Sequence, residues 1–130
     1  MPLSYRINNL SVLVVDDDYV VQRLIVTILK HAGHHGVVVT NGREALSCLA
    51  ERRFDVVLLD VVMPDMDGME TLAAIREGEA ISKKHQRIIM LTGHAEQGDA
   101  ERLQTAGADG YVSKPVDPAR LLAELARTPS

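Results

Sequence analysis

Apolar residues lie in short runs along this chain, and between the runs they recur every three to four positions. The runs are too short for helices and are rich in β-branched residues, which is typical of strands buried on both faces. We predict strands over 12–15, 36–40, 56–59, 88–91 and 111–113. Strands that alternate with helices through short links indicate a parallel sheet with helices on both faces.

Residues that cap backbone groups mark the expected helix boundaries. Asn41, Asp67 and Asp117 each precede a stretch of helical spacing, and Glu44 and Glu70 follow the first two at the capping-box position. We predict helices around 21–29 (ending near Gly33), 45–49, 69–75, 96–106 and 121–125, with a polar loop and some helix extension over 78–87. The histidines that follow the first helix are expected at a solvated helix end: His31, His34 and His35.

Composition indicates one globular domain. Its 130 residues are 46% hydrophobic and 25% charged, with no internal repeat, linker or low-complexity tract. We expect the domain over 10–127, between a flexible N-terminus (1–9) and a tail (128–130). A net charge of −4 argues against direct nucleic-acid binding, and no apolar run is long enough to span a membrane. The single cysteine, Cys48, excludes an intrachain disulfide and fits a reduced, cytoplasmic compartment.

Chemically useful groups follow four of the five predicted strands. Asp16 and Asp17 follow the first, Asp60 the third, Thr92 the fourth and Lys114 the fifth. Parallel strands end at one edge of a sheet, where ligands bind near the reversal of strand order, so these residues should converge. Clustered carboxylates favour a hard cation such as Mg²⁺. A cation, a lysine and a hydroxyl suit the oxygens of a phosphoryl group in transfer, and a carboxylate can be its acceptor.

The motifs that carry these residues resemble the receiver domains of two-component response regulators. They are Val-Leu-Val-Val-Asp-Asp-Asp (12–18), Leu-Leu-Asp-Val-Val-Met-Pro-Asp-Met-Asp-Gly (58–68), Leu-Thr-Gly-His-Ala (91–95) and Tyr-Val-Ser-Lys-Pro (111–115). The resemblance covers about 11–127. It implies a flavodoxin-like (βα)5 doubly wound sandwich, a five-stranded parallel sheet of order 2-1-3-4-5, and often a cis peptide before Pro115.

The resemblance also implies a role for each site residue. Asp60 is the phosphoacceptor, Thr92 and Lys114 contact the phosphoryl oxygens, and Thr92 and Tyr111 form the switch. The implied Mg²⁺ ligands are Asp16, Asp17, Asp60 and the backbone carbonyl of Val62. Such a domain is not an enzyme that turns over a metabolite. It takes its phosphoryl group from a histidine kinase or a histidine phosphotransfer domain, and some receivers are fused to a larger hybrid kinase or form homodimers on phosphorylation.

Two positions depart from the usual receiver pattern. His94 replaces a residue that is more often small or polar, so we expect it to tune water access to the phosphoryl group and hence dephosphorylation. Gly93 replaces a common alanine and is expected to loosen the switching loop. The polar insert 78–87 and the run 92–99 are most similar to receivers attached to hybrid sensor kinases.

Two other functions compete with the phosphoacceptor. Residues 16–21 fit the D-x-D-x-[TV] motif of haloacid-dehalogenase-like phosphatases, with Asp16 as nucleophile and Asp18 as general acid. That family needs a further acidic pair after a later strand, whereas one helix follows Lys114 here, and the scheme leaves Asp60 unused. The third interpretation is a receiver-shaped binding module that works unphosphorylated. The complete set of site residues argues against it.

Overall fold

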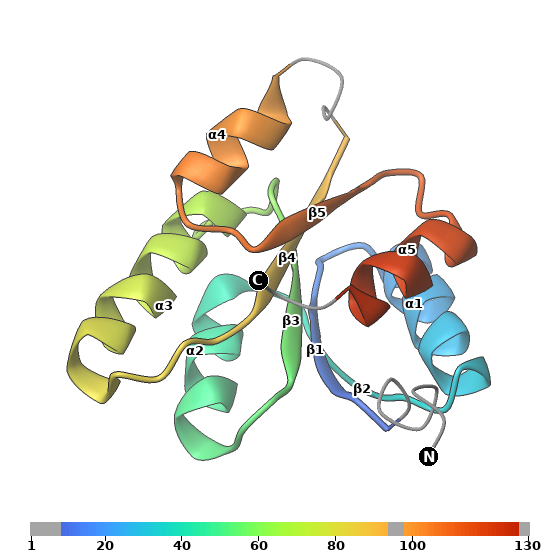
Figure 1. Ribbon diagram of the computed structural model, residues 1–130, viewed down its shortest axis with the longest axis horizontal. Coiled ribbons are helices and arrows are strands. Elements are labelled where there is room, and N and C mark those ends of the chain that lie inside the picture. The colour runs from blue at the N-terminus through green and yellow to red at the C-terminus, as the bar shows by residue number, and fades with distance from the viewer. Residues whose placement is uncertain (1–8, 94–97, 128–130) are drawn as a thin grey trace.

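The computed structural model describes residues 9–93 and 98–127, and in these ranges strands and helices alternate strictly (Figure 1). The strands are β1 Ser11–Val15, β2 His35–Val39, β3 Val56–Asp60, β4 Ile88–Thr92 and β5 Gly110–Ser113. The helices are α1 Tyr19–His31, α2 Gly42–Glu51, α3 Gly68–Ser82, α4 Asp99–Thr105 and α5 Pro118–Ala126. Each predicted strand is confirmed to within one residue at either end. None of the helices in the described ranges is both long and apolar enough to cross a membrane.

The strands form one parallel sheet in the order β2-β1-β3-β4-β5, which confirms the predicted doubly wound fold. The chain moves outward from β1 to β2 and then returns to the other side of β1 for β3. The carboxyl ends of β1 and β3 are therefore adjacent, because Val15 pairs with Leu59. This is the point where the strand order reverses and where such sheets bind ligands.

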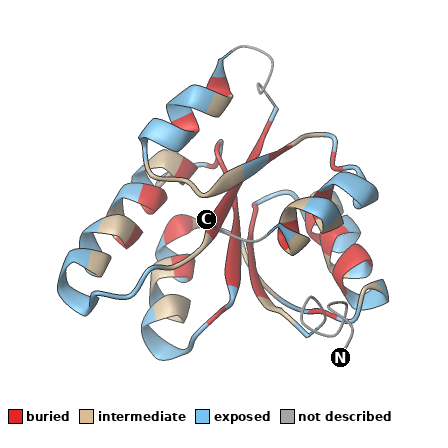
Figure 2. Ribbon diagram, in the orientation of Figure 1, coloured by how far each residue is buried: buried red, intermediate tan, exposed pale blue. Residues whose placement is uncertain are grey.

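Helices cover both faces of the sheet and produce two separate cores. α1 and α5 lie on one face, and α2, α3 and α4 lie on the other (Figure 1). Side chains alternate along β1, so that Val12 and Val14 pack in the core beneath α1 and α5, while Leu13 and Val15 pack beneath the other three helices. Every residue of β3 and β4 is buried, as the red strands at the centre of Figure 2 show. The two central strands that end at the site are thus the most completely buried strands of the sheet.

Most predicted caps are confirmed. Asp67 and Glu70 form the reciprocal capping box of α3, and Asp117 caps α5. Asn41 caps α2, but the Glu44 carboxylate accepts from the backbone N–H and hydroxyl of Thr40, one residue earlier than the capping box requires. The predicted end of the first helix is confirmed, because α1 closes in a Schellman motif with Gly33 at φ 84°. α3 continues through Gly78 to Ser82, in line with the helix extension expected over 78–87. α4 begins at Asp99, and residues 96 and 97 of the predicted helix lie outside the described part.

Close to the N-terminus, the expected solvated helix end is wrong for His34. His34 is buried, and its Nδ1 accepts the backbone N–H of Leu10 at 3.2 Å. Burial, followed by the neighbouring His35, lowers the pKa of His34. Asn9 donates its backbone N–H to Gly33 at 2.9 Å, so the chain before β1 is attached to the end of α1. Residues 1–8 of the predicted flexible N-terminus (1–9) and the predicted tail 128–130 lie outside the described residues.

Candidate functional site

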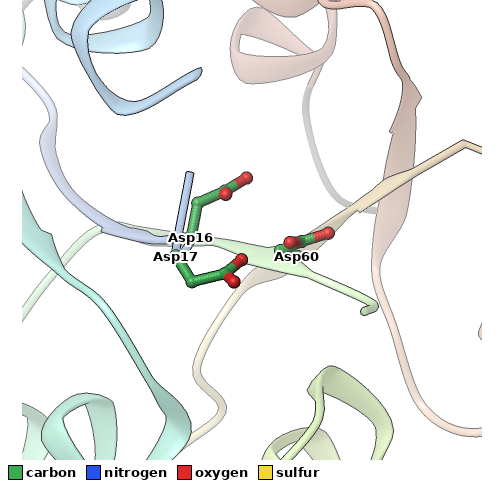
Figure 3. Close-up of side chains that lie close together, drawn as sticks. All are labelled: Asp16, Asp17 and Asp60. Atoms are coloured by element: carbon green, nitrogen blue, oxygen red, sulfur yellow. The ribbon is translucent and has the colours of Figure 1, made fainter. Parts of the chain in front are cut away.

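Three carboxylates meet where the strand order reverses. Asp16 and Asp17 follow β1, and Asp60 is the last residue of β3. One oxygen from each lies within 4.8 Å of the other two, and Figure 3 shows the three side chains gathered at this edge of the sheet. Asp16 and Asp60 are 0% and 5% exposed, whereas Asp17 is exposed. Two of the acids are therefore removed from water while the third faces it.

Lys114 supplies the positive charge among these acids. Its Nζ lies 2.9 Å from Asp16 Oδ2 and 3.1 Å from Asp60 Oδ1. The residue follows β5 directly, and its peptide bond to Pro115 is cis, as the resemblance implied. Its backbone N–H donates to the carbonyl of Thr92 at 2.7 Å, which joins the ends of β4 and β5. The ends of four strands are thus connected through a single lysine.

Burial and charge perturb both partners of the Lys114–Asp60 pair. Burial raises the pKa of Asp60, the nearby Asp16 carboxylate raises it further, and the bonds from Lys114 only partly oppose this. Burial alone lowers the pKa of Lys114, but its hydrogen bonds and charge interactions with Asp16 and Asp60 outweigh burial, so this pKa is raised overall. The raised pKa of Lys114 keeps its ammonium group charged, and the raised pKa of Asp60 means that its carboxylate form gains from additional positive charge.

The backbone around the two buried acids is held by local contacts. Asp16 Oδ1 accepts the backbone N–H of Asp18 at 2.8 Å, and the Gln22 side-chain amide donates to the Asp16 carbonyl at 2.5 Å. Asp18 itself caps α1 by accepting the N–H groups of Val20 and Val21. Gln22 was not predicted as a site residue. Its only signal in the sequence is a polar residue on the same helical face as Ile25.

The turn after β3 approaches Asp60 closely. The Val62 N–H donates to Asp60 Oδ1 at 3.3 Å, and the Gly68 N–H donates to the Val61 carbonyl at 2.9 Å. A Cβ on Gly68 would stand 2.1 Å from the backbone oxygen of Asp60, so only glycine fits at the start of α3. Asp65 takes a left-handed conformation, with φ 63°, inside this turn. The turn therefore fixes both the Asp60 carboxylate and the adjacent Val62.

Thr92 lies at the end of β4, with its hydroxyl turned to an unpredicted partner. Thr92 is 1% exposed, and its Oγ1 donates to Asp99 Oδ2 at 2.7 Å. Asp99 Oδ1 accepts from the Arg102 guanidinium at 3.0 Å. An aspartate that opens a helix is usually interpreted as a cap, so no pattern in the sequence indicated that Asp99 would contact Thr92.

The remaining predicted residues lie around this centre or outside the described part. Val62 is exposed two positions after Asp60. Tyr111 stands on β5 opposite Met90 and is 39% exposed, at a surface hollow between α4 and α5. Gly93 is exposed, and no atom of the described residues lies within 4 Å of a Cβ added there. His94 lies outside the described residues, so its expected effect on dephosphorylation stays a prediction.

The family model and the similar proteins all point to one family. The model of the response regulator receiver domain matches residues 12–126. Hybrid signal transduction histidine kinase I of Dictyostelium discoideum is 38% identical over 123 residues, which cover 91% of this chain but 7% of that kinase. The polar-differentiation response regulator DivK of Brucella anthropi is 30% identical over 112 residues, covering 86% of this chain and 89% of that protein. The chain is thus similar both to a small part of a large kinase and to nearly all of a small regulator.

Solved structures agree with this assignment. The receiver domain of a Pseudomonas aeruginosa sensor histidine kinase, solved with magnesium coordinated in its active-site cleft, has a TM-score of 0.79 and 32% identity, over 90% of this chain and 94% of that one. The Saccharomyces cerevisiae Ssk1 receiver domain, co-crystallised with the histidine phosphotransfer protein Ypd1, has a TM-score of 0.83 and 25% identity, over 91% and 87%. The chain belongs to the family of response regulator receiver domains, the signalling domains of two-component systems.

Proposed function

We propose that this domain accepts a phosphoryl group on Asp60 from the phosphohistidine of a histidine kinase or a histidine phosphotransfer domain, in a Mg²⁺-dependent reaction, and that the acyl-phosphate switches its surface. The observation that carries the proposal is the contact of Lys114 Nζ with both Asp60 and Asp16 at the reversal of strand order. A lysine held there can follow a phosphoryl group on Asp60 without leaving the site.

Transfer to Asp60 is a single displacement at phosphorus. A carboxylate oxygen forms the new P–O bond, while the P–N bond to the donor histidine breaks and its electron pair returns to the imidazole ring. Within the described residues, Asp60 Oδ1 already accepts from Val62 and pairs with Lys114, which leaves Oδ2 as the attacking oxygen. Hydrolysis reverses the modification, because water attacks phosphorus, breaks the acyl P–O bond and releases inorganic phosphate.

The donor set fits magnesium. Oxygen atoms of Asp16, Asp17 and Asp60 converge, and hard oxygen ligands are those that Mg²⁺ prefers. These three carboxylates, with the carbonyl of Val62, would hold the ion. When bound, it would offset the negative charge of the acids and of the phosphoryl oxygens. Lys114 alone offers one positive charge against three negative ones, so a divalent cation improves the balance of charge.

The phosphatase alternative agrees less well with the geometry. Asp16, its nucleophile, is 0% exposed, with Oδ1 bound to the Asp18 N–H and Oδ2 paired with Lys114. Asp18, its general acid, instead caps α1 through Oδ1. Both acids of that scheme thus have structural roles here, while Asp60 stands beside the exposed turn at Val62.

Exposed apolar side chains beside the acids suit a phosphohistidine donor. Tyr19, Val20 and Leu24 on α1 are 67%, 73% and 40% exposed, and Val62 is 68% exposed. The first two directly follow the acidic run, so a helical partner that covers them brings its histidine close to Asp60. The similar Ssk1 receiver domain was co-crystallised with a histidine phosphotransfer protein, which supports a partner of that class for this domain. A cytoplasmic location, fusion to a hybrid kinase and homodimer formation remain predictions within this proposal.

One labelling experiment tests the function. The protein is incubated with Mg²⁺ and acetyl phosphate, and the acyl-phosphate is located by peptide mass spectrometry. We expect a label on Asp60 that is lost in Asp60→Asn and retained in Asp16→Asn. A label on Asp16 would support the phosphatase instead. Absence of any label, with Mg²⁺ binding intact, would favour the binding module that works unphosphorylated.

A further inference from the structure

The Thr92 hydroxyl is engaged by an acid outside the phosphorylation site. Its Oγ1 donates to Asp99 Oδ2 at 2.7 Å, and both residues are buried, at 1% and 8% exposed. Asp99 is the first residue of α4, yet the cap of that helix is Gly98, at φ 87°, with no side-chain hydrogen bond. The Asp99 carboxylate is thus directed inward to Thr92 at the end of β4.

A hydroxyl carries one proton and can donate it to one strong acceptor at a time. If Thr92 donates to a phosphoryl oxygen on Asp60, it must give up its bond to the Asp99 carboxylate. Hydrogen bonds to a charged acceptor are roughly twice as strong as neutral ones. Loss of the Thr92–Asp99 bond therefore opposes occupation of the site by a phosphoryl group. Asp99 and the phosphoryl group therefore compete for the same proton.

The competition extends to the surface of α4. Asp99 Oδ1 accepts from the guanidinium of Arg102, whose side chain is 53% exposed. When the Thr92 hydroxyl leaves, the Asp99 carboxylate loses that donor and keeps its ion pair with Arg102 at the surface of the helix. A buried carboxylate that has lost a donor gains by moving toward a cation and water. The start of α4 should move with it, because Asp99 is its first residue.

We propose that Asp99 is a positioning residue that holds the Thr92 hydroxyl in the resting state and transmits its release to α4. This inference rests on the proposed phosphorylation of Asp60. It makes Asp99 an internal competitor of the phosphoryl group, so that removing its carboxylate eases occupation of the site. The ion pair between Asp99 and the exposed Arg102 would then change at the surface of α4 when the site is occupied.

A double-mutant cycle with beryllofluoride, a non-covalent mimic of the phosphoryl group, tests the proposal. Its affinity in excess Mg²⁺ is measured by ¹H–¹⁵N NMR titration of wild type, Asp99→Ala, Thr92→Val and the double variant. Asp99→Ala should bind about tenfold more tightly, since a bond to a charged group is removed from the resting state only. The same change in the Thr92→Val background should have no effect, because no hydroxyl is left to compete for.

Further variants separate positioning from general damage. Asp99→Asn keeps the shape of the side chain but replaces the carboxylate by an amide oxygen, which is a weaker acceptor for the Thr92 hydroxyl. This variant should fold even if Asp99→Ala does not. Its affinity for beryllofluoride should lie between those of wild type and Asp99→Ala. Glu101→Ala, at an exposed acid on the same turn, should bind like wild type. Beryllofluoride should also increase amide hydrogen exchange at the start of α4 in wild type and much less in Asp99→Ala.

The outcomes also separate this inference from the proposed function. Unchanged affinity in both Asp99 variants, or tightening that persists in the Thr92→Val background, overturns the positioning role while the phosphoacceptor function stands. A wild-type protein that neither binds beryllofluoride nor takes a label from acetyl phosphate on Asp60 overturns both.

Discussion

Lys114 Nζ lies 3.1 Å from Asp60 Oδ1, joining the ends of β3 and β5 across the intervening β4. The lysine side chain is 24% exposed and that of Asp60 is 7% exposed, so this ion pair is largely shielded from water. The same Nζ contacts Asp16, whose side chain is fully buried. One cation thus offsets the charge of two buried acids, and the fold should depend on it most when no metal is present.

Replacement of Lys114 by methionine should destabilise the protein in EDTA by about 2 kcal/mol, because two buried carboxylates lose their counter-charge. Added Mg²⁺ should recover part of that loss, since it binds the same acids. Urea unfolding with and without Mg²⁺ measures both effects. Lys84→Met, at an exposed lysine, is the control and should change little. Equal stability of Lys114→Met and wild type in EDTA would contradict the role of this ion pair.

Because the pKa of Asp60 is raised, ionisation of Asp60 should lower the free energy of unfolding, and this effect should depend on pH. Burial and Asp16 raise this pKa in the folded protein, so between the unfolded-state and folded-state pKa values the folded protein binds more protons. The stability that Asp60 contributes is therefore fully present below its unfolded pKa and is lost as the pH rises through its folded pKa. Asp60→Asn, which stays neutral, should be more stable than wild type at pH 7 in EDTA.

That difference in stability should shrink as the pH falls below the ordinary aspartate pKa of about 3.9, where Asp60 becomes protonated in both the folded and the unfolded state. Thermal unfolding of the two proteins from about pH 3 to about pH 8 measures it. Asp65→Asn changes an exposed carboxyl in the turn after β3 and should follow the wild-type curve. If Asp60→Asn is less stable than wild type at pH 7, then Lys114 must outweigh both burial and Asp16.

Magnesium should stabilise the folded protein through the acidic cluster. A ligand that binds only the folded state at ten times its dissociation constant adds about 1.4 kcal/mol to the free energy of unfolding. Asp17→Asn removes the exposed member of the cluster and should lose most of this gain without changing stability in EDTA. Glu77→Gln, at an exposed acid on α3, should retain the full gain. An Asp17→Asn protein that responds to Mg²⁺ like wild type would place the ion elsewhere.

The sheet and the acidic cluster could be predicted from the sequence because both follow from local patterns. Buried parallel strands give continuous apolar runs, and the residues after those runs must share one edge of the sheet. The runs at 56–59 and 88–91 reproduce β3 and β4 almost to the residue. The convergence of Asp16, Asp17, Asp60 and Lys114 required no side-chain detail beyond that topology.

The partners of the buried polar residues could not be predicted in this way. Gln22, His34 and Asp99 each look like ordinary surface or capping residues, because nothing in a local pattern says which backbone or side-chain group they will meet. Each is buried only because a specific donor or acceptor lies opposite it after folding. The sequence predicted some helix extension over 78–87 but not where it stops, because α3 continues past Gly78, a residue that local propensity disfavours, and ends at Ser82.

The close approach of Gly68 to Asp60 predicts that alanine at Gly68 and alanine at Gly78, both in α3, have opposite effects on stability. An added Cβ at Gly68 meets the Asp60 backbone oxygen at 2.1 Å and the Val61 Cα at 2.7 Å, and neither backbone atom can rotate away. Gly68→Ala should therefore cost about 2–3 kcal/mol of stability and reduce phosphorylation of Asp60, because β3 or α3 must shift.

Gly78, in the same helix, has no atom of the described residues within 4 Å of an added Cβ. Gly78→Ala should therefore stabilise the protein by about 0.5–1 kcal/mol through the better helix propensity of alanine, with phosphorylation unchanged. Urea unfolding, together with the rate of labelling by acetyl phosphate, measures both variants. A Gly68→Ala protein that is more stable than wild type and is labelled at the wild-type rate would contradict this prediction. The turn after β3 would then be free to relax, and it would not fix the position of Asp60.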